Sequence, residues 1–456
     1  MKPPTLATMS PRRRIAAIAV AIVLLVALAG LWIMLPPRAL DFAGGHAVSL
    51  SAYTGPNPTG APSDLRSADL VARGQYLTVA ADCQVCHTAT GGQPFAGGRA
   101  FPTPFGVLYS PNITADRETG IGAWSDADFI RAVHEGVARG GERLYPAFPY
   151  ESYTLLSDDD VRAIKAYLFS LPAVRATAPA NHLTFPFNQR WLMGIWSALY
   201  NPDRRFQPHT DRSPAWNRGA YLAEALGHCG DCHTPRNLAQ ALDNRRKFAG
   251  AVTQGWRAFD ITADAASGVG AWSDAQLADY LRNGHASGRG SAGGPMAEEV
   301  DFSLNALSPA DIAAMVAYLR SIPPIGSRDL PAAKGSAASE SPRLMAVGFD
   351  PRGKQIFEGA CASCHGWSGV SLLTDYATLT GDRAVNDASA INVAQVVLSG
   401  ERRRTADGEV MMPAFGAAYS DTEIAAVANY VTARFGAAPS HLTARDVARL
   451  RQATSQ

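Results

Sequence analysis

Three copies of the pattern Cys-x-x-Cys-His carry the chemistry of this 456-residue chain, and together they use all six of its cysteines. Two thiols three residues apart lie on one helical turn, where both can bond to the vinyl groups of one haem. The adjacent histidine is then placed under the iron. The pattern predicts three covalently bound haem c groups, each with a histidine as its first axial ligand. The residues are Cys83, Cys86 and His87; Cys229, Cys232 and His233; and Cys361, Cys364 and His365.

Two other uses of a Cys-x-x-Cys pair fit the sequence less well. A structural zinc site takes four ligands, commonly from two matched pairs. This chain has three pairs, an odd number, and a histidine follows each of them. A thioredoxin-like redox pair needs only one motif, near a βαβ pattern. Haem attachment is the interpretation that accounts for all three copies.

The second axial ligand of such a haem usually comes from a loop well downstream, and a methionine there raises the reduction potential. Met296 lies 63 residues after His233, and Met412 lies 47 residues after His365. We expect these two methionines to ligate the second and third haems. Met411 is a weaker rival to Met412.

The first haem lacks a methionine at the corresponding place. Phe148 stands there, 61 residues after His87, and no methionine occurs between residues 35 and 192. Phenylalanine cannot ligate iron, so we expect this haem to be five-coordinate or to use another donor. His134 is the nearest such donor in sequence, and Met193 is more remote. Without a methionine ligand, the first haem should have a lower potential than the other two.

An internal repeat supplies the elements that position the first two motifs. Each unit is expected to contain a haem-motif helix, a loop rich in glycine and proline, a middle helix, a ligand loop and an amphipathic closing helix. Strand signals are weak, so the fold class is predicted to be mainly α. The matching segments are 112–116, 120–126 and 166–172 in the first unit and 260–264, 268–274 and 317–323 in the second. The serines that fit N-cap positions are Ser125, Ser157, Ser273 and Ser308.

The chain length suits three tandem cytochrome c-like domains after an N-terminal transmembrane helix. The third unit is shorter and more divergent, but it keeps an acidic helix start at Ser420-Asp421. The expected boundaries are 1–37 for a cytoplasmic tip and transmembrane anchor, 68–175 for domain 1, 176–213 for an aromatic interdomain segment, 214–326 for domain 2, 327–346 for a flexible linker, 347–436 for domain 3 and 437–456 for a C-terminal tail.

The segment 176–213 carries many large apolar side chains. Among them are Phe185, Phe187, Trp191, Trp196 and Tyr200. Packing between two domains is the favoured interpretation. A docking surface for a partner subunit, or a contact with the membrane interface, where aromatic residues are enriched, is the alternative.

The N-terminus predicts a membrane anchor. Three arginines, residues 12–14, precede an apolar run of 21 residues from Ile15 to Leu35, which is long enough to span a bilayer. Because a signal peptide has a shorter apolar region, an uncleaved anchor is favoured. The positive-inside rule keeps the arginines cytoplasmic and places the rest of the chain in the bacterial periplasm. A net charge of +1, with no basic tract beyond residues 402–404, argues against a nucleic-acid partner.

Beyond the haem motifs, several short segments resemble the three-haem cytochrome c subunits of membrane-bound bacterial dehydrogenases, such as quinohaemoprotein alcohol dehydrogenase and gluconate 2-dehydrogenase. The likeness covers roughly residues 68–436. In that family a methionine normally stands where Phe148 stands here, and typical members carry a cleaved signal. The segments are Ala80-Ala81-Asp82-Cys83, Gly97-Gly98, Thr103-Pro104-Phe105-Gly106, Asn112-Ile113-Thr114, Tyr145-Pro146-Ala147, Gly227-His228-Cys229 and Cys232-His233-Thr234-Pro235-Arg236-Asn237.

The resemblance implies an electron conduit in the inner membrane. A large catalytic subunit, with pyrroloquinoline quinone, flavin or molybdenum, would oxidise an alcohol, sugar acid or aldehyde, and this chain would pass the electrons to ubiquinone or a terminal oxidase. The chain itself shows no nicotinamide or flavin fingerprint and no nucleophile constellation. Two alternatives stay open: an anchored stand-alone electron shuttle, and a peroxidase-type haem enzyme that uses an open first haem.

Overall fold

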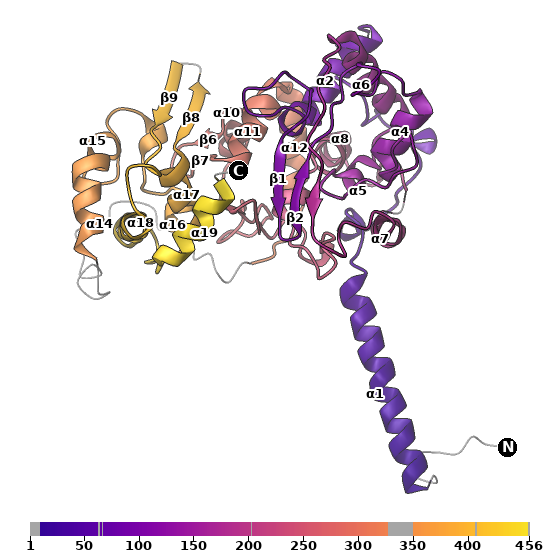
Figure 1. Ribbon diagram of the computed structural model, residues 1–456, viewed down its shortest axis with the longest axis horizontal. Helices are drawn as coiled ribbons and strands as arrows, with labels where there is room; N and C mark the ends of the chain where they lie inside the picture. Colours follow the sequence, from indigo (N-terminus) through magenta and orange to yellow (C-terminus); the bar gives the residue numbers. More distant parts are fainter. Residues whose placement is uncertain are drawn as a thin grey trace, which may run out of the picture.

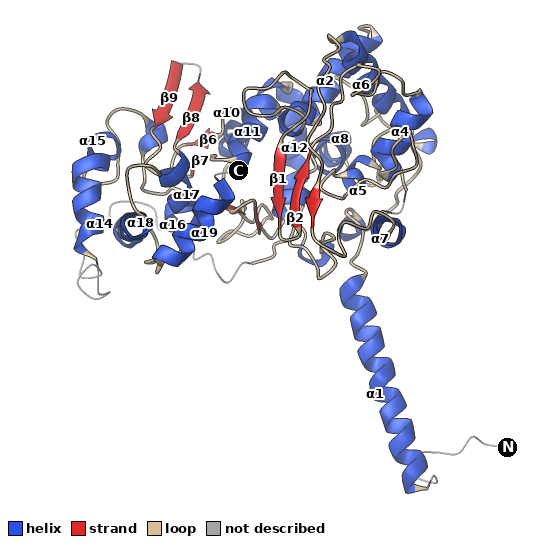
Figure 2. Ribbon diagram, viewed as in Figure 1, coloured by secondary structure: helices blue, strands red, loops and turns tan. Residues whose placement is uncertain are grey.

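The computed structural model describes residues 10–62, 64–65, 67–201, 203–326, 350–405 and 408–454. Helices joined by long loops make up most of the chain, and one long helix projects away from the rest (Figure 1). The strands that the structure describes are short and lie in small antiparallel sheets (Figure 2). The predicted mainly α fold class is confirmed.

Three pairs of packed helices organise the chain, and each pair flanks one haem motif. In every pair the first helix lies just before the motif and the second closes the unit. We name the units by the expected domain ranges: unit 1 is 68–175, unit 2 is 214–326 and unit 3 is 347–436. The pairs are α2 (Leu70–Ala80) with α6 (Asp158–Ser170), α8 (Pro214–Tyr221) with α12 (Pro309–Leu319), and α14 (Pro351–Ile356) with α18 (Asp421–Phe435).

A glycine allows the two backbones to touch in every pair. A Cβ atom added to it would fall far inside van der Waals contact with a backbone carbonyl oxygen of the partner helix, so no larger residue fits without moving the helices apart. The same close contact recurs in all three units, including the divergent third. The added Cβ would lie 1.9 Å from Ala163 O at Gly74, 1.9 Å from Ala314 O at Gly219 and 2.2 Å from Ala426 O at Gly353.

The predicted helix starts are confirmed. Ser125 and Ser273 open the middle helices α4 (Asp126–Glu135) and α10 (Asp274–Asn283), each with a capping box. The closing helices of the first two units begin after Ser157 and Ser308, whose side chains accept backbone N–H bonds. Ser420 does the same at the start of α18, again in a capping box. These caps satisfy N–H groups that the helix itself leaves without partners.

The remaining elements connect these helices. Unit 1 and the segment after it contain α3 (Cys83–Cys86), β1 (Ala100–Thr103), β2 (Gly106–Tyr109), α5 (Tyr150–Tyr153), β3 (His182–Leu183) and α7 (Leu192–Tyr200). Unit 2 contains α9 (Gly230–His233), β4 (Ala251–Thr253), β5 (Trp256–Ala258), β6 (His285–Ala286), β7 (Gly290–Ser291) and α11 (Pro295–Phe302). The third unit and the segment after it contain α15 (Ala362–His365), α16 (Arg383–Asn386), α17 (Ile391–Ser399), β8 (Glu401–Thr405), β9 (Gly408–Met412) and α19 (Ala444–Thr454).

Two segments differ from their expected roles. The range 437–456, expected to be a tail, contains α19, which packs against α17 and α18 with Val447 fully buried. The range 176–213 does more than join two domains, because β3 extends the β1–β2 hairpin and α7 forms a helix of its own. Both differences depend on a packing partner distant in sequence. The expected linker 327–346 lies outside the described residues.

Units 1 and 2 share one hydrophobic core, whereas unit 3 has a core of its own. A hydrogen bond from unit 1 to a buried ion pair of unit 2 also joins these units. Arg218 Nη2 lies 2.6 Å from Asp311 Oδ2, and the Tyr76 hydroxyl donates to the same oxygen at 2.6 Å. Unit 3 docks on unit 2 through polar contacts, such as that of the buried Arg403 with Asp301 at 3.1 Å.

The projecting helix is α1 (Pro11–Met34). Its stretch Pro11–Gly30 is long and apolar enough to cross a membrane, and the described chain does not bury that stretch. Among the described residues, only the last turn of α1, at Trp32 and Met34, contacts the units. This agrees with the expected anchor.

Candidate haem-attachment sites

Each motif forms a short helix that places its two cysteines on one turn. The thiols are unpaired and half-buried, except for Cys364, which is exposed. Backbone irregularities precede all three helices. In units 2 and 3 a π-helical turn comes first, at Leu222–Leu226 and Phe357–Cys361. In unit 1 Asp82 takes a left-handed conformation with φ of 47°. Such local irregularities mark functional sites, because they redirect the side chains that follow.

The histidine of each motif is held by its Nδ1 atom. Nδ1 lies within hydrogen-bond distance of a backbone carbonyl oxygen in all three units. A carbonyl can only accept, so Nδ1 carries the hydrogen, and the lone pair of Nε2 is left free to bind a metal. The distances are 2.8 Å from His87 to Pro111 O, 2.6 Å from His233 to Phe259 O and 2.7 Å from His365 to Ala377 O.

Burial supports the same ligand role. It lowers the pKa of His87, His233 and His365 below the ordinary value of 6.5, so each imidazole is neutral at physiological pH. Neutral imidazole is the form that ligates iron.

The sequence analysis did not identify the carbonyl groups that accept from the motif histidines. For two of them, however, the internal repeat contains a signal. Pro111 and Phe259 immediately precede the repeated segments that begin at Asn112 and Asp260. The side chains of Asn112 and Asp260 accept backbone N–H bonds from the residues two positions further on, at 2.9 and 2.8 Å, which fixes both turns. The repeat thus marks the loops that hold the first two histidines.

The two candidate methionine ligands lie on different kinds of element. Met296 is in the first turn of α11 and is partly buried against the core of units 1 and 2. Met412 is the last residue of β9 and pairs with Glu401 of β8. Met411, its rival, is exposed, and Arg402 Nη2 lies 3.4 Å from its sulfur. Successive strand residues point to opposite faces, so only one of the two adjacent methionines can face a given side of the hairpin.

Phe148 is packed among aromatic rings. Its centroid lies 5.5 Å from that of Tyr153 and 6.4 Å from that of Tyr150. Met193, the more remote alternative donor, is half-buried in α7.

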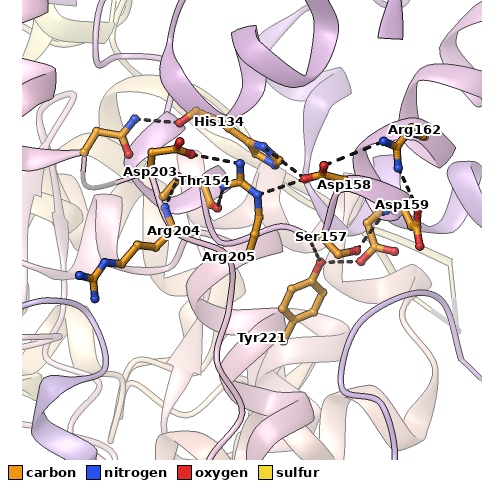
Figure 3. A network of polar contacts seen from close by, with 12 residues as sticks. His134, Thr154, Ser157, Asp158, Asp159, Arg162, Asp203, Arg204, Arg205 and Tyr221 are labelled. Atoms are coloured by element: carbon orange, nitrogen blue, oxygen red, sulfur yellow. Dashed lines mark hydrogen bonds and ion pairs between the residues drawn. The ribbon is translucent and has the colours of Figure 1, made fainter. Parts of the chain in front are cut away.

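His134 lies in a polar cluster at the start of α6, shown in Figure 3. Its Nδ1 is 3.8 Å from Asp158 Oδ1, and Arg205 Nε lies 3.1 Å from the same oxygen. Burial, together with the charge of Arg205, lowers the pKa of His134 to about 4. The labelled partners in this cluster include no residue of a haem motif, so the geometry does not support His134 as a donor to the first haem.

The first and second motifs lie against each other. Tyr153 donates its hydroxyl hydrogen to Ala81 O at 2.6 Å, and its ring meets that of His228 edge-on, with centroids 5.5 Å apart. Ala81 precedes the first motif by two residues, and His228 directly precedes the second. Within the second motif, Asp231 accepts a hydrogen bond from Ser152 of unit 1 at 3.1 Å. One tyrosine therefore bridges the approaches to both motifs.

The helix that carries Met296 also touches the first motif. Arg99 donates to Val85 O, inside that motif, at 3.0 Å and to Glu298 of α11 at 2.7 Å. Asp82 and Glu299 lie next to this pair, and burial raises the pKa of both carboxyl groups. The nearby Glu299 raises the pKa of Asp82 further, whereas the hydrogen bond with Asp82 lowers that of Glu299. The first and second haem-attachment sites are therefore in direct contact, and buried side chains lie between them.

Unit 3 contacts unit 2 at the loops that hold histidines. The ring of His285 stacks on Tyr376 with centroids 4.3 Å apart, next to the Ala377 carbonyl that His365 uses. From the other side, Arg383 donates to Asp260 O at 2.8 Å, and its guanidinium lies 4.9 Å from the centre of the Phe259 ring. All three sites therefore belong to one continuous body.

The described residues offer no comparable site for zinc. Among the described residues, no group of three or more His, Cys, Asp and Glu side chains is placed to hold a metal ion. A structural zinc centre needs four such ligands, whereas a haem needs two thiols and one well-held imidazole from each motif.

Helix pairs around Cys-x-x-Cys-His motifs with fixed histidines define a c-type cytochrome. The cytochrome c family model matches residues 71–172 and 351–434. The gluconate 2-dehydrogenase cytochrome c subunit of Pantoea cypripedii is 38% identical over 403 residues, covering 84% of this chain and 90% of that protein. The fructose dehydrogenase cytochrome subunit of Gluconobacter japonicus is 36% identical over 407 residues, covering 85% and 83% respectively.

The chain therefore belongs to the family of dehydrogenase cytochrome c subunits, and the resemblance noted in the sequence is confirmed. A nicotinate dehydrogenase subunit of Pseudomonas putida is also similar, with 41% identity over 373 residues, or 81% of this chain. The present chain spans only 31% of the length of that protein.

Proposed function

We propose that this chain is an electron-transfer subunit with three tandem cytochrome c domains, at 68–175, 214–326 and 347–436. Each domain holds one covalent haem c, and the chain passes electrons from a catalytic dehydrogenase subunit towards ubiquinone or a terminal oxidase. The observation that carries the proposal is the threefold repetition of one geometry, a motif histidine whose Nδ1 is bound to a backbone carbonyl.

The residues present fit haem. The six motif cysteines would form the thioether bonds, the three histidines would ligate iron, and Met296 and Met412 would complete the second and third sites. A haem supplies one-electron exchange without a proton or a bond change in the protein. Apolar side chains beside the third motif support the fit, because Trp367, Leu372 and Leu373 are 62, 97 and 71% exposed in the chain alone. Such a surface suits an apolar macrocycle.

The contacts between units support a continuous path for electrons. Tyr153 and Arg99 link the surroundings of the first and second motifs. His285 and Arg383 link the second and third units at the loops that hold His233 and His365. Because these contacts involve the haem-bearing segments themselves, neighbouring haems would approach each other closely. The order of their potentials would set the direction of flow.

The expected compartment is the bacterial periplasm. We assign α1 as the anchor in the inner membrane, with Arg12, Arg13 and Arg14 on the cytoplasmic side. The haem domains follow α1 and would lie on the opposite side of the membrane.

The expected partner is a large dehydrogenase subunit, since the named relatives are cytochrome subunits of gluconate 2-dehydrogenase, fructose dehydrogenase and quinone-type alcohol dehydrogenase. Its cofactor would be pyrroloquinoline quinone, flavin or molybdenum. Extraction of native membranes with mild detergent and affinity purification of this chain test the idea. A co-purifying large polypeptide with such a cofactor supports it. A solitary haem protein overturns it in favour of an electron shuttle.

Haem content is tested separately on the purified chain. Spectroscopic quantification should give three covalent haems per polypeptide, and the double variant Cys361→Ala/Cys364→Ala should give two. Zinc without haem, or a full haem count in that variant, would contradict the assignment of the third motif.

The first haem is expected to be open, because Phe148 occupies the place of a methionine. Carbon monoxide added to the reduced protein should change the absorption of about one haem in three. The absence of any spectral change would show that another donor closes this site.

A further inference from the structure

Helix α7 carries an uncovered apolar face. Trp191, Ile195 and Leu199 recur at a spacing of four residues and are 64, 56 and 54% exposed. This spacing places them along one side of the helix. The opposite side is buried, with Trp196 only 9% exposed. The helix is therefore amphipathic, and nothing in the described chain covers its outer face.

The orientation of α7 is fixed from within. Trp196 donates its ring N–H to Ala239 O at 2.8 Å, and its ring meets that of Tyr150 edge-on at 6.0 Å. The same ring lies 5.2 Å from that of Tyr200, one turn further along. Because these contacts hold the inner side of α7 on loop 237–245 and unit 1, the direction of the apolar face is set by the fold.

The same loop holds the end of the anchor helix. Asn237 donates to Met34 O at 3.2 Å, and Asn244 donates to Pro37 O at 3.0 Å. The guanidinium of Arg245 lies 4.0 Å from the centre of the Trp32 ring. Loop 237–245 therefore fastens both α7 and the last turn of α1, and Figure 1 shows α7 beside that end of α1, beneath the units.

This arrangement identifies what covers the apolar face. If α1 crosses a membrane, the bilayer surface must meet the chain where the apolar helix ends, near residues 32–37. Helix α7 lies at that end of the units (Figure 1). Leu238, which is 86% exposed, follows Asn237, the residue that donates to Met34 O. The exposed Arg38 follows Pro37, which accepts from Asn244, and its charge suits lipid phosphates; the exposed Arg246 of the same loop is paired with Asp243 at 3.1 Å. Tryptophan, leucine and arginine in such an arrangement are typical of a helix in the membrane interface.

We propose that α7 lies in the periplasmic interface of the membrane, with Trp191, Ile195 and Leu199 against phospholipid. This is a second membrane contact, and it rests on the proposed role of α1 as an anchor. It would hold the haem units at a fixed tilt instead of leaving them on a single tether. A catalytic subunit is the competing occupant, but the rigid link between α7 and the end of α1 favours lipid.

Site-specific photo-crosslinking in native membranes tests the proposal. A benzophenone amino acid replaces Ile195 in the full chain, the membranes are irradiated, and the purified protein is analysed by mass spectrometry and gel electrophoresis. The expected product carries the added mass of one phospholipid. An adduct with another polypeptide, or no adduct, overturns the proposal.

Two matched positions make the result unambiguous. Leu24, exposed in the middle of α1, should give a lipid adduct, whereas Leu70, exposed at the start of α2 and remote from α1, should give none (Figure 1). If Leu24 also fails, the anchor itself is wrong. If Leu24 succeeds and Ile195 fails, the anchor stands and only the interfacial contact of α7 is refuted.

Discussion

Replacing Gly353 with alanine should destabilise unit 3 specifically. The glycine lies where α14 crosses α18, and an added Cβ would fall 2.2 Å from Ala426 O and 3.0 Å from Tyr430 Cβ. The nearest obstacle is backbone, so no change of side-chain rotamer relieves it. The two helices must therefore move apart.

The magnitude follows from this geometry. Real Cβ contacts are essentially never shorter than 3.0 Å, so the helices must part by about 1 Å, and overpacking of this kind costs about 1–3 kcal/mol. We take the upper end of this cost, about 3 kcal/mol, because the added Cβ would collide with a backbone atom that cannot rotate away. The higher helix propensity of alanine compared with glycine offsets at most about 1 kcal/mol of this cost. The net loss of about 2 kcal/mol should lower the melting temperature of a unit of this size by roughly 8–16 °C.

Covalent haem allows each unit to be followed in the full chain. The purified protein in detergent is heated, treated briefly with protease and separated on a gel stained for haem. The fragment carrying the third haem should disappear at a lower temperature in Gly353→Ala, while the fragments from units 1 and 2 should be unchanged. Gly359→Ala is the matched control, because a Cβ there meets nothing within 4 Å.

Equal melting of Gly353→Ala and the unmodified chain would refute the reasoning. It would mean that the α14–α18 contact does not need glycine and that unit 3 is not built like the first two. A comparable loss of melting temperature in Gly359→Ala would show that any substitution near the motif weakens unit 3. Close packing at Gly353 would then not be the cause.

Three further predictions concern single side chains. Phe148→Met should raise the potential of the first haem and abolish its binding of carbon monoxide, measured by spectroelectrochemical titration and absorbance; an unchanged potential would mean that position 148 does not face the iron. The pKa of His134 is about 4 in the folded chain, against 6.5 ordinarily, so the unfolded chain binds the proton first as pH falls. The histidine should therefore cost about 2 kcal/mol of stability between pH 7 and pH 5, and denaturant unfolding of His134→Gln should lack that loss. Arg218→Met leaves the buried Asp311 without its charged partner, which should destabilise units 1 and 2 together, since they share one core, by about 3–5 kcal/mol; unfolding of one unit alone would show that they are not a single cooperative block.

Much of this protein could be predicted from its sequence because the signals are local. The thiols and imidazole of each motif are adjacent, so their attachment to one haem needs only one turn of helix. The serine caps act within three residues, and all of those predicted are present. The apolar run that forms α1 is also a local pattern. Such features do not depend on how the rest of the chain folds.

Tertiary structure decided which residues that are distant in sequence contact each other. The carbonyls that hold His87 and His233 come from loops 24 and 26 residues away, so only the path of each loop selects them. His134 looked like a possible ligand, yet packing places it beside Asp158 and Arg205. The range 437–456 looked like a tail, but it contains α19, which is held by packing against α17 and α18.

The apolar residues of α7 show the same division. Their spacing identifies a helix with two unlike faces, but burial is a property of the folded surface, and the sequence cannot say which face packs inward. The hydrogen bond from Trp196 to Ala239 decides that, and the contacts of Asn237 and Asn244 fasten the same loop to the end of the anchor helix. Residue types and spacing determined which chemistry the chain can do. The long-range contacts determined where that chemistry lies relative to neighbouring sites and to the membrane, because those distances exist only after the chain has packed.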